Sequence, residues 1–279
     1  MKDEHASAFH SFEHAGWQKA ANQYDAGFGG VTSQAVVPLL GATGATSGIR
    51  LLDVACGPGY VAAAAAGLGC SVIGVDFSSE MVEIAGKMFN REYPDLEFRV
   101  GNAESLTMAS GSFDAVVMNF GMLHLAQPDR AISEAFRVLR SGGRYAFTVW
   151  DVPPKTAAFE IVLDAVRSYG NMNVPLPEGP PFFRFSDPVE SARSLQAAGF
   201  EDIETVVVPQ TWKLKDGSEL LSTMRRAAVR TAALLNMQSP EALAAIENEI
   251  TARTEGFRKS GGIELPMPAI LTSAVKPPI

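Results

Sequence analysis

Hydrophobic residues in the middle of the chain follow two alternating patterns. Short apolar runs, typical of buried strands, alternate with stretches in which apolar residues recur every three or four positions, as on one face of a helix. The predicted strands cover 49–54, 72–76, 113–118 and 144–150, with a weaker one at 96–100. This alternation is typical of βαβ units around a parallel sheet.

Two helices are predicted between these strands. Ser78 is suited to cap the first, whose apolar residues recur at helical spacing from Met81 to Met88. The second covers 132–139, and Gly142 and Gly143 are expected to stop it. Both helices would pack their apolar faces against the sheet.

The flanking segments have other patterns. Residues 6–40 predict a helix that is broken at Gly27, Gly29 and Gly30. Residues 153–185 are rich in proline and glycine and predict a long ordered loop or lid that follows a helix over 157–168.

The last third of the chain is expected to return to the sheet. A helix from Asp187 to Gly199, a strand over 203–208, helical structure over 218–257 and a last strand over 268–275 are predicted there. We therefore expect a single domain with a helical cap inserted before its last strand.

Composition narrows the class of protein. The 279 residues are 47% hydrophobic and 19% charged, as in a globular protein, and the net charge of −8 argues against a nucleic-acid partner. The acidic N-terminus does not resemble a signal peptide, and the apolar run 61–68 is shorter than the roughly 20 residues that span a bilayer. A cytoplasmic location without membrane insertion is expected, with Cys56 and Cys70 unpaired.

The stretch LLDVACGPGYVAAAAAGLGCSVIGVDFS carries the candidate chemistry. A strand ending near Asp53 leads into a glycine turn, where Gly57 and Gly59 lack a Cβ and let a ligand approach the backbone N–H groups. Asp76 ends the next strand, 19 residues after Gly57, and is placed to accept hydrogen bonds from a ribose diol.

Two cofactor classes use such a turn. The pattern from Gly57 to Ala62 fits the G-x-G-x-x-G/A motif of dinucleotide sites. A carboxylate at Asp53 would repel a pyrophosphate but would suit the ammonium of a methionine moiety. The alternative role for Asp53 is that of a turn or capping residue.

Four motifs in this order resemble the class I S-adenosylmethionine-dependent methyltransferases, in particular those of ubiquinone and menaquinone biosynthesis. The motifs are LLDVACGPG, GVDFSSEM, GNAESLTMASGSFDAVVMNFGMLHL and RVLRSGGRYAFTVW, which together cover about residues 45–150. The resemblance implies an α/β fold with a Rossmann-like, mostly parallel seven-stranded sheet, helices on both faces and a helical cap. It divides the single domain 1–279 into an N-terminal lid (1–44), a cofactor-binding core (45–150) and an acceptor side (151–279) with cap helices at 216–258.

The resemblance also implies a set of residues that bind S-adenosyl-L-methionine. The loop from Asp53 to Gly59 would surround the methionine part, Asp76 the ribose hydroxyls, and Phe77 and Met81 the adenine. Asn102 stands where the family often has Asp, and its amide oxygen is expected to bind the base more weakly. The complete implied set is Tyr24, Asp53, Ala55, Gly57, Gly59, Asp76, Phe77, Met81, Asn102, Ala103, Glu104 and Asn119.

Histidines offer the candidate base. If the acceptor is a hydroxyl, His124 is the natural proton acceptor, and a packing or capping role is the equal alternative. His10 and His14 have the spacing of metal ligands, but without a third ligand in the sequence a solvated helix face is favoured and no metal is expected.

The acceptor pocket is expected in the variable segments, where aromatic side chains indicate an apolar acceptor. Its predicted lining is Trp150, Phe182, Phe183, Phe185 and Met224. Arg225, Arg226 and Arg230 could bind an anionic acceptor or a membrane surface, but the solvated face of a cap helix is favoured for them.

The predicted function is transfer of a methyl group from S-adenosyl-L-methionine to an oxygen, carbon or nitrogen of a largely apolar small molecule. One alternative is an NAD(P)-dependent oxidoreductase, although none of the five tyrosines has a lysine four residues later, as the short-chain type requires. The other alternative is a non-catalytic, cofactor-binding regulatory protein.

Overall fold

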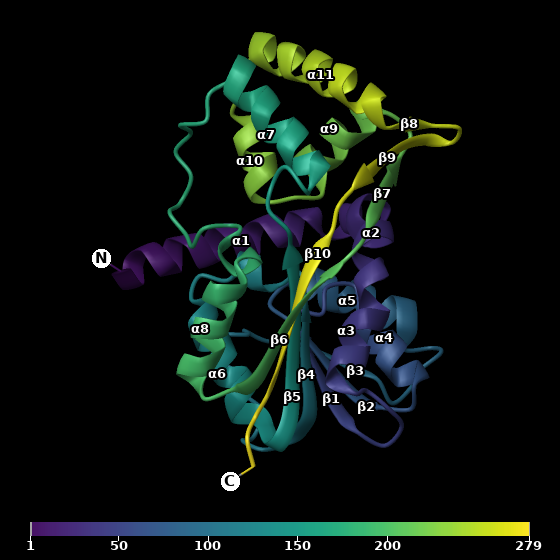
Figure 1. The fold of residues 1–279 in the computed structure, drawn as a ribbon, viewed down its shortest axis with the longest axis vertical. Coiled ribbons are helices and arrows are strands. Elements are labelled where there is room, and N and C mark those ends of the chain that lie inside the picture. The colour runs from purple at the N-terminus through teal and green to yellow at the C-terminus, as the bar shows by residue number, and fades with distance from the viewer. Residues whose placement is uncertain (1, 279) are drawn as a thin grey trace.

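A seven-stranded sheet forms the centre of the computed structural model, which describes residues 2–278 (Figure 1). Its strand order is β3-β2-β1-β4-β5-β10-β6. The first five of these strands run parallel to one another, and β10 is antiparallel to both β5 and β6. The strands of this sheet are β1 (Arg50–Val54), β2 (Ser71–Asp76), β3 (Glu97–Val100), β4 (Phe113–Asn119), β5 (Leu139–Trp150), β6 (Glu201–Val208) and β10 (Ala269–Val275).

Helices cover both faces of this sheet, as expected. In Figure 1, α3, α4 and α5 lie on one side of the strands and α6 and α8 on the other. These helices are α3 (Val36–Thr43), α4 (Tyr60–Gly67), α5 (Ser79–Phe89), α6 (Pro128–Val138) and α8 (Pro188–Ala198). The predicted caps form: Ser78 Oγ accepts the Met81 N–H at 3.2 Å, and Asp187 Oδ1 accepts the Val189 N–H at 2.8 Å.

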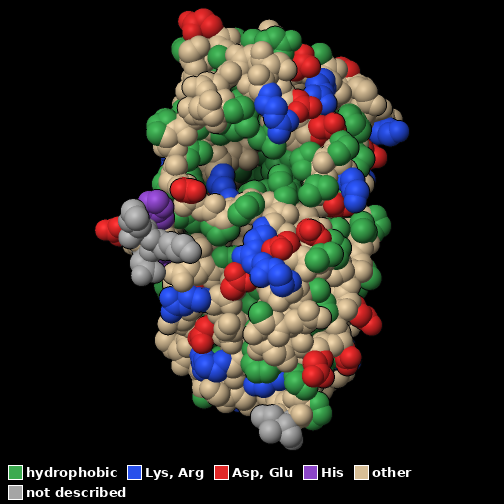
Figure 2. Space-filling view, turned by 60° about the vertical axis from the view of Figure 1, so that its left-hand side comes forward, with side chains coloured by type: hydrophobic (Ala, Val, Ile, Leu, Met, Phe, Trp, Pro, Cys, Tyr) green, Lys and Arg blue, Asp and Glu red, His purple; other side chains and the backbone are tan. Residues whose placement is uncertain are grey.

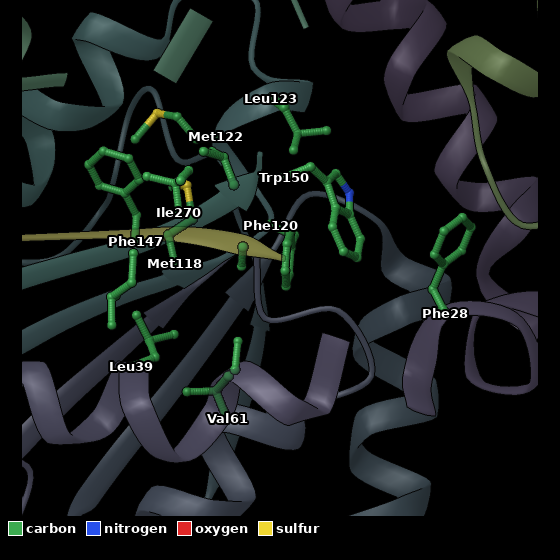
Figure 3. Close-up of a cluster of buried hydrophobic side chains, with 14 of the residues drawn as sticks. Phe28, Leu39, Val61, Met118, Phe120, Met122, Leu123, Phe147, Trp150 and Ile270 are labelled. Atoms are coloured by element: carbon green, nitrogen blue, oxygen red, sulfur yellow. The ribbon is translucent and has the colours of Figure 1, made fainter. Parts of the chain in front are cut away.

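The core lies between the central strands and the helices that cover them. Figure 3 shows Met118 of β4, Phe147 of β5 and Ile270 of β10 together with Leu39 of α3 and Val61 of α4. All five side chains are buried. This burial of apolar area on both faces is what a mostly parallel sheet requires.

The predicted helix stop at Gly142 and Gly143 is wrong, because both glycines lie inside β5. The helix ends at Val138, and the chain is already extended at Leu139. A bulge follows, since Phe113 pairs with Leu139 but Ala115 pairs with Arg144. Gly142 has a φ of +76°, so glycine is needed here for the backbone of the bulge and not to end a helix.

The predicted break at Gly27, Gly29 and Gly30 is also wrong. The first helix, α1 (Lys2–Tyr24), continues through a π-helical turn (Asp25–Gly29) into α2 (Gly30–Thr32). A Cβ at Gly27 would lie 2.8 Å from the Thr223 side chain and 2.9 Å from that of Ala227. The glycine therefore allows close packing against the cap and does not interrupt the helix.

The cap holds more elements than the sequence predicts. The expected helical stretch 218–257 is divided into α9 (Gly217–Arg226), α10 (Arg230–Asn236) and α11 (Pro240–Thr254). α11 packs against α9 and against α7 (Ala157–Tyr169), and α10 packs against α9. A second sheet, not predicted, has the order β7-β9-β8. Its strands are β7 (Thr211–Leu214), β8 (Arg258–Lys259) and β9 (Gly262–Pro266).

The second sheet joins the cap to the central sheet. β7 follows β6 after two residues, and β9 precedes β10 by two. Both connections therefore leave the main sheet at the same end of these two neighbouring strands (Figure 1). The Met267 N–H donates to the Gln210 carbonyl at 2.9 Å, which joins these two connections.

Cys56 and Cys70 are free and buried, as expected. Within residues 2–278, no helix combines the length and apolar character needed to cross a membrane.

Truncating the sheet-facing side of α6 should destabilise the fold. Ile132 is fully buried, so Ile132→Ala should lower the free energy of unfolding by about 2–5 kcal/mol through lost burial and the cavity left behind. Arg130→Ala on the exposed face of the same helix should change it by no more than about 0.5 kcal/mol. Chemical denaturation of both variants tests this, and equal effects would contradict the assigned orientation of α6.

Candidate active site

A cavity of about 1050 Å³, part of it open to solvent, lies at the carboxyl ends of the parallel strands. Asp76 of β2, Asn119 of β4 and Trp150 of β5 line it from below. Residues of α1 and the segment 228–231 of the cap line it from above. Figure 2 shows a hollow on one face of the molecule, ringed mostly by hydrophobic side chains. Ligands of open α/β sheets bind at this edge.

The glycine turn after β1 contributes two glycines with different tasks. Gly57 lines the cavity with a φ of +51°, and a Cβ there would have no neighbour within 4 Å, so it would project into open space. Gly59 has a φ of +90°, and its Cβ would lie 2.7 Å from the Phe98 ring. Gly57 therefore leaves room for a ligand, whereas Gly59 permits packing at the start of α4.

Asp76 is held in place by the backbone. Its Oδ2 accepts the Gly57 N–H at 2.9 Å and its Oδ1 accepts the Ser78 N–H at 2.8 Å. Burial raises the pKa of this carboxyl from 3.8 to about 6, while these two hydrogen bonds act in the opposite direction. The side chain lines the cavity, in the position expected of a ribose-binding carboxylate.

Asp53 lies beneath the turn and not in the cavity wall. It is fully buried, and its Oδ2 accepts the Ala62 N–H at 3.0 Å. Its Oδ1 has no hydrogen-bond partner among the described residues. Burial raises the pKa of Asp53 to about 8. An unpartnered buried carboxylate is unfavourable by itself, so a positive charge held against the turn would stabilise its ionised form.

The wall beyond Asp76 contains the expected Phe77, Met81 and Ala103. Phe77 packs edge-on against His10 and His14, with ring centroids 5.8 and 5.4 Å apart. The predicted solvated face for this histidine pair is therefore wrong, because α1 packs over the cavity and half-buries both rings.

Asn102 also lines the cavity, with its Oδ1 accepting the Glu104 N–H at 2.8 Å. Glu104 itself is buried outside the wall, and its Oε1 accepts the Gln127 N–H at 2.8 Å, before α6 begins. Ala55, with a φ of +54°, reaches the wall from the glycine turn.

Tyr24 and Asn119 meet at Thr32, and all three line the cavity. The Tyr24 hydroxyl donates to Thr32 Oγ1 at 3.2 Å, and burial raises the pKa of this phenol to about 12. Asn119 Nδ2 donates to the Thr32 carbonyl at 3.2 Å, and Asn119 Oδ1 accepts from Thr148 Oγ1 at 2.6 Å. These bonds tie the N-terminal segment to the end of β4.

Aromatic side chains build the other end of the cavity. The expected Trp150 and Phe182 are joined by Phe28, Phe120 and Phe159, which sequence reasoning missed. The Phe120 and Trp150 rings lie 4.1 Å apart, and both are labelled in Figure 3. Phe120 has a φ of +54°, rare for a large side chain, and only the fold reveals that it faces the cavity.

Three residues predicted for the acceptor pocket do not line it. Phe185 is 3% exposed and packs against Phe147 of the sheet, because the 3₁₀ turn at 184–186 directs it inward. Phe183 packs against Phe159 behind the wall, and Met224 is fully buried in the cap.

A buried polar cluster completes the site. His124 lines the cavity, and its Nδ1 lies 3.0 Å from Oε2 of Glu13 on α1. Glu13 Oε1 accepts from Arg230 Nε at 2.8 Å. The Arg230 side chain is only 18% exposed. The expectation that Arg230 belongs to a solvated helix face is therefore wrong. Sequence reasoning missed Glu13, because nothing in a helical pattern marks a carboxylate for burial.

The comparison with protein families and curated relatives agrees with the geometry. Residues 52–147 match the model of a methyltransferase domain. A demethylmenaquinone methyltransferase of Beutenbergia cavernae is 43% identical over 115 residues, which is 41% of this chain and 46% of the relative. The demethylmenaquinone methyltransferase of Renibacterium salmoninarum is 35% identical over 134 residues, which is 47% of this chain and 55% of the relative. The chain spans about half the length of the curated relatives it matches.

Solved structures share the fold at low identity. The [4+2]-cyclase SpnF has a TM-score of 0.55 and 24% identity, covering 88% of this chain and 82% of that chain. Geranyl diphosphate methyltransferase, solved in complex with S-adenosylmethionine, has a TM-score of 0.52 and 19% identity, covering 88% and 85%. The resemblance drawn from the four sequence motifs is confirmed, since residues 52–147 match the model of a methyltransferase domain.

Proposed function

We propose that this protein transfers a methyl group from S-adenosyl-L-methionine to an oxygen, carbon or nitrogen atom of a largely apolar small molecule. The observation that carries the proposal is one cavity with two unlike ends. One end is the glycine turn with the Asp76 carboxylate, and the other is an aromatic chamber beside His124. When bound, S-adenosylmethionine supplies a methyl group activated by its sulfonium.

The residues of the first end fit this cofactor. The space that a Cβ at Gly57 would fill admits a ligand close to the backbone, and the pre-oriented Asp76 carboxylate can accept hydrogen bonds from a diol. The unpartnered oxygen of Asp53 below the turn favours a ligand that carries positive charge there. Phe77 and Met81 offer the apolar surfaces for a purine ring.

The second end fits an apolar ring. Aromatic side chains around it exclude water and restrict how a flat acceptor can lie, so that they orient it for displacement. The named relatives methylate demethylmenaquinone, and an acceptor of that type, a substituted aromatic ring with hydroxyl or keto groups, is our proposal for this chain.

The single-domain arrangement belongs to the same proposal. Segment 1–44 would act as the lid, 45–150 as the cofactor core and 151–279 as the acceptor side, with its cap helices within 216–258. The comparisons give no support to a nicotinamide-dependent oxidoreductase. A cytoplasmic location stays a prediction of the sequence.

Removing the Asp76 carboxylate should weaken cofactor binding. Asp76→Ala should lower the affinity for S-adenosylhomocysteine by about 10- to 100-fold, the expected loss for hydrogen bonds to a charged group. Asp95→Ala, an exposed carboxylate in the turn before β3, is the control and should bind as the wild type does. Isothermal titration calorimetry measures both, and wild-type affinity in Asp76→Ala would refute the assignment of this end of the cavity.

The buried carboxyl of Asp53 should make the free energy of unfolding depend on pH. Its pKa is about 8 in the folded protein against an ordinary 3.8, so the folded state holds the proton more tightly. The contribution of Asp53 to the stability of the ligand-free protein should therefore fall as the pH rises from about 4 to about 8. Asp53→Asn keeps an oxygen for the Ala62 N–H and removes the charge, so its stability relative to the wild type should increase over that range by more than about 1 kcal/mol. Urea denaturation at several pH values tests this, and parallel curves would contradict it.

His124 should be needed for turnover and not for cofactor binding. His124→Asn keeps an N–H to donate to Glu13 but removes the base, so kcat should fall about 100-fold or more for an acceptor that must lose a proton. The affinity for S-adenosylhomocysteine should stay within a factor of about three. Unchanged turnover would show that His124 serves packing alone.

A further inference from the structure

Helix α1 places a fully buried carboxylate behind the histidine of the cavity. Glu13 is 0% exposed, and its two oxygens point to different partners. Oε2 lies 3.0 Å from His124 Nδ1, and Oε1 accepts from Arg230 Nε at 2.8 Å. The cluster joins three segments far apart in sequence, namely α1, the turn after β4 and the start of α10.

Further contacts hold Arg230 beside Glu13 Oε1. Its terminal nitrogens donate to the Pro180 carbonyl at 2.8 Å and to the Leu123 carbonyl at 2.7 Å. Its guanidinium also lies over the Phe9 ring, 4.4 Å from the centroid. Because a guanidinium only donates hydrogen bonds, the group opposite Arg230 Nε must always be an acceptor.

The carboxylate determines which ring nitrogen of His124 carries the proton. An ionised carboxylate only accepts, so Nδ1 must be the N–H in the neutral ring and Nε2 the lone pair. The ring is held by Trp17, with centroids 4.8 Å apart, and by Phe182 at 6.2 Å. No protein group within residues 2–278 forms a hydrogen bond with Nε2, and the ring lines the cavity.

We infer that Glu13 is a positioning residue that keeps His124 in the Nδ1–H tautomer, with Nε2 available to take a proton from an acceptor hydroxyl. This inference rests on the proposed function. The acceptor O–H bond breaks, its proton passes to Nε2, and the electron pair stays on the acceptor oxygen as the nucleophile. The imidazolium that forms is stabilised by the Glu13 carboxylate, whose charge Arg230 balances. The acceptor class is thereby narrowed to a ring with an ionisable hydroxyl.

Glu13→Gln is the decisive variant, because Arg230 dictates how the new amide must lie. The amide oxygen has to face Arg230 Nε, which turns the amide NH₂ toward His124 Nδ1. Nδ1 must then accept, so the proton moves to Nε2 and the base is blocked. A substitution that changes shape very little thus reverses the tautomer.

The tautomer is measured by ¹⁵N NMR at a pH at which the imidazole rings are neutral, and the chain has four histidines to assign. The wild type should show His124 as Nδ1–H, and Glu13→Gln should show it as Nε2–H. With a hydroxylated aromatic acceptor, kcat of Glu13→Gln should fall about 100-fold or more, with the affinity for S-adenosylhomocysteine within a factor of about three of the wild type. Glu201→Gln, an exposed residue of the edge strand, is the matched control and should change neither readout.

Three outcomes would overturn the inference: an Nε2–H tautomer in the wild type, an unchanged tautomer in Glu13→Gln, or a reversed tautomer without loss of kcat. The wild-type spectrum decides even where the variant does not fold. Failure of the proposed function looks different, because the wild type would then not bind S-adenosylhomocysteine, whatever tautomer His124 adopts.

Discussion

The buried charge of Glu13 is the constraint on which the arrangement around the cavity depends. A carboxylate taken out of water is strongly unfavourable unless charged and hydrogen-bonded partners surround it. Its partners come from the core and from the cap, through His124 and Arg230. The N-terminal helix is docked so that Glu13 lies between these two partners. The roof of the cavity follows from that position, since His10, Trp17 and Tyr24 reach the wall from the same helix.

The end of the cavity formed by the glycine turn depends on two further carboxylates, at the ends of β1 and β2. Asp76 is oriented by two backbone N–H groups and faces the cavity, whereas Asp53 keeps one oxygen without a partner beneath the turn. Burial raises the pKa of both carboxyls, so their ionisation is unfavourable in the ligand-free protein, and a positively charged ligand would offset that cost. This end of the cavity thus favours a cationic cofactor, while the aromatic chamber opposite favours an apolar acceptor.

Much of the fold could be predicted because its elements have local signals. The parallel strands were marked by apolar runs, and the helices at Ser78 and Asp187 by capping residues that form the expected hydrogen bonds. The errors occurred where glycine had more than one possible role. Gly142 serves a strand bulge and Gly27 a close helix contact, and neither role is visible without the neighbouring segment. The short second sheet was missed because its strands are only 4, 2 and 5 residues long, which leaves little alternation to detect in the sequence.

The sequence by itself determined the end of the cavity formed by the glycine turn, because a strand, this turn and the next strand lie within about thirty residues and their order imposes their geometry. The positions of Gly57 and Asp76 at this end could be predicted without information from elsewhere in the chain. Only the tertiary structure decided the aromatic end of the cavity. It buries Phe185 and Met224, brings Phe120 and Phe159 to the cavity wall, and pairs Glu13 with His124 across 111 positions of sequence. Such contacts arise from packing between distant segments, and no local pattern encodes which side chains will meet.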